Sequence, residues 1–72
     1  MPNLNHEPAA VLYARRKAGL TQAEAALMIG KSPQLLADIE AGRRNATPKV
    51  LAELARAYNC PLVVLERKRV SA

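Results

Sequence analysis

Side chains that could carry out catalysis or bind a metal are few in this sequence of 72 residues. The chain has one cysteine, Cys60, and one histidine, His6, so neither an internal disulfide nor a cluster of zinc ligands can form. The acidic residues are scattered, and Cys60 has no histidine near it in the sequence. Because catalysis needs a convergent set of acid, base or nucleophilic groups, we predict that the chain is not an enzyme and holds no metal or cofactor.

Basic side chains offer a different chemistry, which is the binding of a polyanion. Lys and Arg total 11 against 6 acidic residues, which gives a net charge of +5 and a pI near 10.0. Such an excess is typical of nucleic-acid binding, but a merely soluble basic surface has it equally often. Two of the cations, Arg43 and Arg44, directly follow Gly42. Their position relative to the helices must decide between these two interpretations.

Short helices must position these groups. Half of the residues are hydrophobic, but Phe and Trp are absent, which favours a core of Ala, Leu, Val and Ile between closely packed helices. Helix starts are predicted at Pro8, at Thr21 with Glu24 as a capping box, at Ser32 before Pro33, at Thr47 before Pro48, and at Pro61. Left-handed stops are predicted at Gly19, Gly30, Gly42 and Asn59.

These signals predict an all-α domain of five helices, over residues 8 to about 18, 21–29, 32–41, 47–58 and 61 to about 67. We expect residues 1–7 to form a flexible arm, residues 8–67 the domain, and residues 68–72 a basic tail. No apolar run reaches the roughly 18 residues of a membrane span, and the stretch MPNLNHEP lacks the regions of a signal peptide. The sequence therefore predicts a cytoplasmic protein without a membrane partner.

The predicted second and third helices meet at the corner around Gly30 and form a helix-turn-helix, whose second helix can enter the major groove of DNA. This region resembles the Cro and phage-repressor family of helix-turn-helix DNA-binding proteins, of the xenobiotic-response-element type. The resemblance runs from about Val11 to Leu65 and rests on three spaced motifs, which read TQxExA from residue 21, GxS from residue 30 and IExGxRN from residue 39. It implies a lambda-repressor-like fold for the helix-turn-helix DNA-binding domain of residues 8–67.

The resemblance also implies roles for single residues. The expected phosphate contacts lie at the start of the second helix, in the turn and after the third helix: Gln22, Lys31, Arg43, Arg44 and Asn45. Backbone amides at a helix start add to such contacts, although a solvated helix start is the alternative for Gln22. Arg15 and Glu40 occupy positions where related repressors have a partly buried ion pair between the first and third helices.

Base reading is expected from the exposed start and middle of the third helix, at Ser32, Pro33, Gln34, Ala37 and Asp38. The amide of Gln34 can both donate to and accept from adenine, and Asp38 can accept from cytosine. Pro33 and Ala37 can contact thymine methyl groups. The alternative for Asp38 is an ion pair with Arg43 or Arg44.

The resulting prediction is a sequence-specific transcriptional regulator that acts as a repressor and is located at the nucleoid. We expect it to bind a palindromic operator in double-stranded DNA through the helix of about residues 32–41. The alternative is an antitoxin-like or protein-interaction module that binds a partner protein and uses DNA for autoregulation. Leu27 and Met28 stand at positions that are usually charged, so they form either a protein-binding patch or incidental exposed residues. A third possibility is a domain that has lost base readout.

The last predicted helix bears on assembly. Leu62 and Leu65 have core spacing, which leaves Val63 and Val64 facing outward. Related repressor domains pair through this end of the fold, so we expect Val63 and Val64 to form the interface of a weak homodimer that DNA strengthens. The alternative is a monomer with two incidentally exposed valines.

Overall fold

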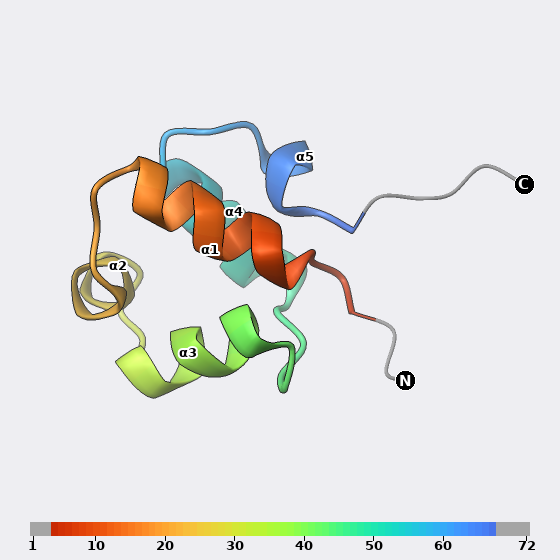
Figure 1. Cartoon of the computed structure of the whole chain (residues 1–72), viewed down its shortest axis with the longest axis horizontal. Helices are drawn as coiled ribbons and strands as arrows, with labels where there is room; N and C mark the ends of the chain where they lie inside the picture. The colour runs from red at the N-terminus through yellow and green to blue at the C-terminus, as the bar shows by residue number, and fades with distance from the viewer. Residues whose placement is uncertain (1–3, 68–72) are drawn as a thin grey trace, which may run out of the picture.

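Residues 4–67, the part of the chain that the computed structural model describes, contain five α-helices (Figure 1). In chain order they are α1 (Pro8–Lys17), α2 (Gln22–Met28), α3 (Pro33–Ala41), α4 (Pro48–Ala57) and α5 (Leu62–Leu65). The all-α class is therefore confirmed. Expectations for residues 1–3 and for the tail at 68–72 lie outside the described residues. None of the helices in the described part is long and apolar enough to cross a membrane.

Side-chain caps begin α2, α3 and α4 at the residues that the sequence indicates. Thr21 Oγ1 accepts the Glu24 amide at 3.1 Å while Glu24 Oε1 accepts the Thr21 amide at 2.8 Å, so the capping box is complete. Ser32 and Thr47 each accept the amide three residues ahead, and each is followed by proline at the first helical position. These local hydrogen bonds satisfy amides that have no partner inside the helix.

Left-handed backbone closes the corners between helices. Gly30 at φ 68° turns the chain from α2 into α3, and Gly42 at φ 78° ends α3. Asn59 takes the same role after α4 at φ 53°, which its short polar side chain tolerates. The corner at Gly30 is what brings α2 and α3 into the predicted helix-turn-helix arrangement.

One core lies between the helices, and its largest buried aliphatic side chains are Val11, Leu36, Ile39, Leu51, Leu54 and Leu65. Helix α1 packs on both α3 and α5, and α2 packs on α3. The prediction that Leu62 joins this core is wrong, because its side chain is 37% exposed. Helix α5 is a single turn, shorter than the predicted 61–67, and it directs Leu65 inward while Leu62 stays at the surface.

The expected flexible arm is also wrong for residues 4–7. His6 is 1% exposed and forms an isolated antiparallel bridge with Glu66. The Glu7 amide donates to the Leu65 carbonyl at 2.9 Å, and the Arg67 amide donates to the Asn5 carbonyl at 3.1 Å. The physical reason is that this segment finds backbone partners just after α5 and buries its imidazole against the core, which short-range sequence patterns do not reveal.

Candidate nucleic-acid interface

The helix-turn-helix consists of α2, the turn at residues 29–32 and α3. The turn is closed by backbone bonds, among them Lys31 N to the Ala26 carbonyl at 2.9 Å. Helix α2 buries Ala25 and Ala26, and α3 buries Leu36 and Ile39. Helix α3 lies along one edge of the molecule (Figure 1). The face of α3 opposite its buried residues, here called its outer face, is turned away from the other helices. This arrangement leaves a whole helix face available to a partner.

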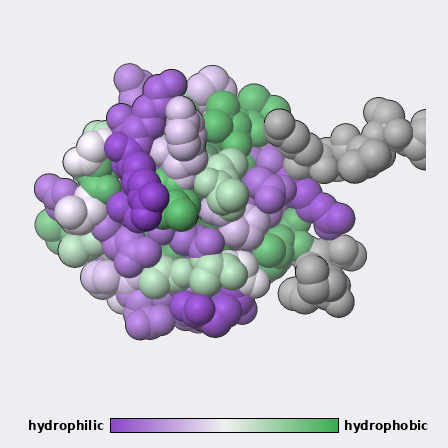
Figure 2. All heavy atoms as spheres, in the orientation of Figure 1, coloured by the Kyte–Doolittle hydropathy of each residue, from purple (hydrophilic) through white to green (hydrophobic). Residues whose placement is uncertain are grey.

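Polar and small side chains make up that outer face. Ser32, Pro33 and Gln34 are exposed at the start of α3, and Ala37 and Asp38 are half-buried one turn later. Figure 2 shows hydrophilic side chains along the lower edge of the molecule, where α3 and the following loop lie. The five residues predicted to read bases therefore share one surface.

Asp38 connects this face to the α3–α4 loop (residues 42–47). Its Oδ1 accepts a hydrogen bond from Gln34 Nε2 at 3.1 Å and one from Arg43 Nε at 3.0 Å. The guanidinium Nη2 of Arg43 also lies 3.0 Å from the same oxygen. Of the two alternatives considered for Asp38, pairing with Arg43 is thus present in the structure. The pair partly neutralises the one acidic side chain on the outer face.

Cations flank the outer face of α3. Lys31 in the turn, Arg43 and Arg44 are all exposed, and 63% of the Arg43 side chain is accessible. The Arg43 and Arg44 amides both donate to the Asp38 carbonyl, at 2.9 and 3.3 Å, which folds the loop back against α3. Asn45 is exposed too, but its Oδ1 accepts the Asn5 amide at 2.7 Å. A phosphate contact by Asn45 would therefore use its Nδ2 group.

A buried ion pair sets the angle between the helices that carry these groups. Arg15 Nε donates to Glu40 Oε2 at 2.7 Å and Arg15 Nη2 donates to Oε1 at 3.1 Å, with side-chain exposures of 10% and 4%. Arg15 Nη1 also donates to the Leu20 carbonyl at 2.8 Å. The hydrogen bond to Glu40 raises the pKa of Arg15 despite the opposing effect of burial. Arg15 therefore stays charged, and its hydrogen bonds to Glu40 join α1 to α3.

Gln22 joins the same cluster from the start of α2. Its Nε2 donates to Glu40 Oε1 at 3.0 Å, and the residue is half-buried. Glu40 therefore receives hydrogen bonds from both α1 and α2 while it stands on α3. The sequence indicated Gln22 as a phosphate contact but gave no sign of this bond, because the partner is distant in the chain.

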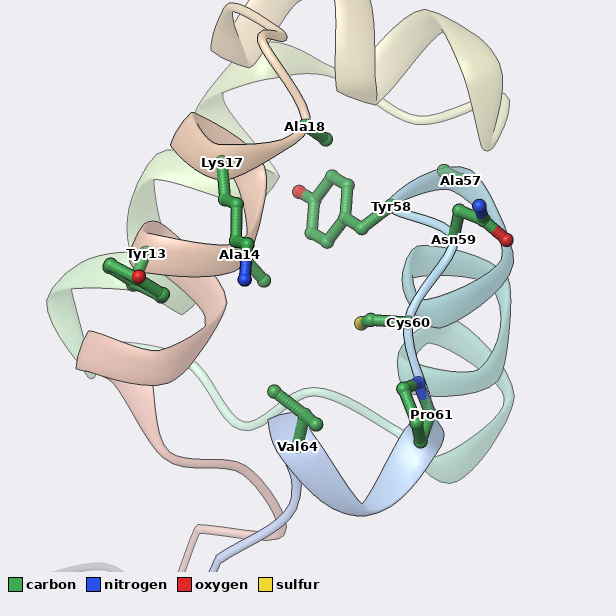
Figure 3. Close-up of a pocket in the computed structure, with 10 residues that line it drawn as sticks. All are labelled: Tyr13, Ala14, Lys17, Ala18, Ala57, Tyr58, Asn59, Cys60, Pro61 and Val64. Atoms are coloured by element: carbon green, nitrogen blue, oxygen red, sulfur yellow. The ribbon is translucent and has the colours of Figure 1, made fainter.

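A concave region lies between α1 and the α4–α5 connection, with a volume of about 610 Å³. Lys17, Tyr58, Cys60 and Val64 are among its lining residues, and the thiol of Cys60 points into it (Figure 3). Burial raises the pKa of the Cys60 thiol, so the thiol stays in its unreactive protonated form. Within residues 4–67 no group of three His, Cys, Asp or Glu side chains is placed to hold a metal ion.

Val63 and Val64, the predicted dimer contacts, lie on α5 and are 70% and 44% exposed. Figure 1 places α5 on the opposite side of α1 from α3. The structure therefore separates these valines from the outer face of α3.

Sequence reasoning missed two buried polar groups, His6 and the hydroxyl of Tyr58, because neither belongs to a motif.

Comparison with known proteins places this geometry in context. The helix-turn-helix family profile matches residues 11–65. The chain is 51% identical over 51 residues to the uncharacterized HTH-type transcriptional regulator y4dJ of Sinorhizobium fredii, covering 71% of this chain and 66% of that protein. It is 36% identical over 53 residues to a Yarrowia lipolytica protein named for multi-protein-binding factor 1, covering 74% of this chain and 35% of that protein.

Solved structures agree with the sequence relatives. A crystal structure of the clp gene regulator ClgR from Corynebacterium glutamicum superimposes with a TM-score of 0.74 at 28% identity, covering 78% of this chain and 73% of that one. A second ClgR crystal structure gives a TM-score of 0.75 with 60% of its chain covered. Because the profile covers most of the chain and the solved structures share its helices, the chain belongs to the Cro/C1-type helix-turn-helix family.

Proposed function

We propose that the protein is a DNA-binding transcriptional regulator that inserts α3 into the major groove of double-stranded DNA. The observation that carries this proposal is the outer face of α3, which is polar, unobstructed and flanked by Lys31, Arg43 and Arg44. Membership of the helix-turn-helix family and the likeness to HTH-type regulators support it, and they argue for a regulator rather than an enzyme. The chain spans about a third and about two thirds of its two curated relatives, so the proposal concerns this domain.

Phosphate contacts position the domain in this proposal. Arg44 is exposed at the loop, and Arg43 reaches the same surface while it pairs with Asp38. Lys31 extends the positive surface to the turn. The second Nε2 hydrogen of Gln22 and the Nδ2 group of Asn45 are the amide donors that this proposal assigns to phosphates. Such contacts fix the register of a protein on DNA without reading its sequence.

Base reading falls to Ser32, Pro33, Gln34, Ala37 and Asp38. Gln34 and Asp38 hydrogen-bond each other in the free protein, so DNA must exchange that bond for contacts to base edges. Arg43 holds Asp38 by its charge, which reduces the repulsion between the carboxylate and the phosphates. We propose repression of a palindromic operator by a homodimer paired through Val63 and Val64, in the cytoplasm at the nucleoid.

A second candidate is a module that binds a partner protein and regulates itself through DNA. The observation in its favour is the end of α2, where Leu27 is 81% and Met28 57% exposed in adjacent positions. Copurification of a tight protein partner that Leu27→Ser releases, without a change in DNA affinity, would establish this candidate beside the first.

Selection of bound sequences from a random double-stranded pool tests the first proposal directly. We expect an enriched palindrome whose half-sites lie about one DNA turn apart. Failure to enrich any sequence would contradict base reading, and an enriched single site without symmetry would contradict the dimer.

The phosphate contacts are tested by salt dependence on the selected site. Log affinity is expected to fall by about 0.9 per log salt for each phosphate neutralised, so Arg43→Ala with Arg44→Ala should flatten that slope and weaken all sequences alike. A matched control removes two cations elsewhere, with Lys17→Ala and Arg56→Ala, which lie on α1 and α4. Equal slopes for the two double variants would remove the loop from the interface.

A further inference from the structure

One side chain outside the helix-turn-helix binds both ends of the segment that carries the two arginines. His6 Nε2 lies 2.7 Å from the Ile39 carbonyl oxygen, in the last turn of α3. On the other side of the ring, the Ala46 amide donates to His6 Nδ1 at 3.4 Å. The imidazole is 1% exposed, so these two backbone groups are its hydrogen-bonding environment.

The chemistry of the two partners fixes the form of the ring. A carbonyl oxygen accepts and cannot donate, so Nε2 must carry a proton toward Ile39. A backbone amide donates and cannot accept, so Nδ1 must present its lone pair to Ala46. His6 therefore acts as a neutral imidazole with the proton on Nε2. We call the three residues His6, Ile39 and Ala46 the His6 bridge.

Neighbours of His6 reinforce its hold on the α3–α4 loop. The Asn5 amide donates to Asn45 Oδ1 at 2.7 Å, and Asn5 Nδ2 donates to the Ala46 carbonyl at 3.1 Å. Near the start of the loop, a Cβ atom added to Gly42 would lie 3.8 Å from Cδ1 of Leu4 and 3.4 Å from Cγ of Pro8, the first residue of α1. The N-terminal segment thus touches the loop at its start and again next to its end.

The same segment is anchored on its far side. His6 pairs with Glu66 in the antiparallel bridge, and backbone bonds join Glu7 to Leu65 and Asn5 to Arg67. Residues 5–7 therefore lie between the end of α5 with the residues that follow it and the loop after α3. The segment that carries His6 is therefore itself hydrogen-bonded to the rest of the domain.

We propose that His6, assisted by Asn5, is a positioning residue for DNA binding, which holds the α3–α4 loop so that Arg43 and Arg44 face the DNA backbone before contact. The inference rests on the proposed DNA-binding function. Its physical basis is preorganisation, because a loop that is already ordered loses less conformational freedom on binding. Neither residue touches DNA in this proposal, and both act through the arginines.

A double-mutant cycle on the selected DNA site tests this inference. His6→Ala should weaken binding at least about fivefold, which corresponds to ordering a short loop segment. In the Arg43→Ala, Arg44→Ala background, the same substitution should have little further effect, because the groups that it positions are gone. An equal loss in both backgrounds would overturn the proposal, since a general loss of stability does not depend on the arginines.

Asn5→Ala is the second variant, in case His6→Ala does not fold. The Asn5 side chain is exposed, so its removal leaves the core intact and deletes one hydrogen bond to Ala46. We expect about a twofold loss of DNA affinity, and we expect no such loss in the Arg43→Ala, Arg44→Ala background. An unchanged affinity in the parent background would overturn the role of Asn5.

A readout without DNA separates this inference from the proposed function. Nitrogen NMR of the full chain should show His6 as the neutral ring with the proton on Nε2, and hydrogen exchange should show a protected Ala46 amide. In Asn5→Ala the Ala46 amide should exchange faster while amides within α3 keep their protection. A charged ring, or the proton on Nδ1, would overturn the His6 bridge even if DNA binding is confirmed. Failure of the parent to bind any DNA would instead overturn the proposed function.

Discussion

At the scale of single residues, Glu40 gathers the side-chain hydrogen bonds that join α3 to α1 and α2. Its carboxylate accepts two hydrogen bonds from Arg15 and one from Gln22, so one side chain on α3 holds both α1 and α2. A buried carboxylate that loses such partners is left with its full desolvation penalty. The pair therefore matters more for what its disruption would do than for its net contribution to stability.

Arg15→Ala is expected to lower the free energy of unfolding by about 3 to 5 kcal/mol, because it leaves Glu40 uncompensated at 4% side-chain exposure. That is a large part of the stability of a small domain. Urea denaturation followed by circular dichroism measures the loss. Arg16→Ala on the same helix, at an exposed position, is the matched control and should have little effect. Equal midpoints for the two variants would contradict a buried pair.

Tyr58→Phe is expected to keep or raise the melting temperature. The Tyr58 hydroxyl is buried with no hydrogen-bond partner among the described residues, and its ring fills the space between α4 and α1 (Figure 3). Burial, followed by the charge of Glu40, raises the pKa of Tyr58, so the hydroxyl stays protonated. Removing an unsatisfied polar group while keeping the ring is favourable. The matched control is Tyr13→Phe at the surface. If Tyr58→Phe lowered the free energy of unfolding by more than about 1 kcal/mol beyond the change in this control, the hydroxyl would have a partner.

Gln34→Ala is expected to weaken binding to the selected DNA site by about 1 to 3 kcal/mol and to relax the sequence preference at one base pair. Gln34 is exposed, so the melting temperature should not change. Repeating the selection with the variant measures the effect, and the other positions of the motif should keep their ranking. An unaltered motif would assign base reading to other residues or to DNA shape.

At the scale of helices, each start is a local event that the sequence encodes directly. The capping box at Thr21 and Glu24 makes this visible as a dependence on pH. Hydrogen bonds from the Thr21 backbone amide and side chain lower the pKa of Glu24. The ionised carboxylate therefore favours the folded state, and its contribution is complete above the unfolded pKa of about 4.3. It is lost as the pH falls through the lower pKa of the folded state.

Glu24→Gln keeps a side chain that can cap the helix but cannot titrate. We expect the parent to melt at a higher temperature than this variant at pH 7, and the difference to shrink as the pH falls below the unfolded pKa of about 4.3. Other carboxylates are common to both proteins and cancel in the comparison. A difference in melting temperature that stays constant from pH 7 to pH 3 would show that the charge of Glu24 is not part of the cap.

The same locality explains how far the sequence could predict the structure. Caps and left-handed stops depend on neighbours within a few residues, so all five helices and their corners could be found. The burial of His6 depends on Ile39 and Ala46, some 33 and 40 positions away, and no local pattern encodes it. The exposure of Leu62 follows from where a single-turn helix lies on the domain, which spacing alone does not fix.

The candidate site shows the same division. The turn after α2, the outer face of α3 and the exposed arginines follow from the motif and its spacing. The choice of Arg43 over Arg44 as the partner of Asp38 depends on how the loop folds back onto α3. The bond between Gln22 and Glu40 likewise needs the angle between two helices. Contacts between elements are thus the part that the structure adds.

At the scale of the whole molecule, residues 5–7 and 65–67 connect the two proposed interfaces. Residues 5–7 contact the loop of Arg43 and Arg44 on one side and residues 65–67, at the end of α5 and just after it, on the other. Helix α5 itself carries exposed Val63 and Val64 away from α3. Two domains paired through α5 would therefore leave both copies of the outer face of α3 open to DNA.

Val64→Asp tests that pairing. A two-fold axis through α5 would place two copies of α3 about one DNA turn, roughly 34 Å, apart in successive major grooves. An interface made of a few valines is small, so we expect weak association in free solution and cooperative binding to the full palindrome. The substitution places like charges across the axis and should abolish cooperativity, while affinity for a single half-site stays within about twofold because Val64 is far from α3. Titrations of half-site and palindromic DNA with the same preparation measure both quantities, and Val64→Ala separates the effect of charge from that of lost apolar surface. If Val64→Asp binds the palindrome as tightly and as cooperatively as the parent, the dimer axis does not pass through α5.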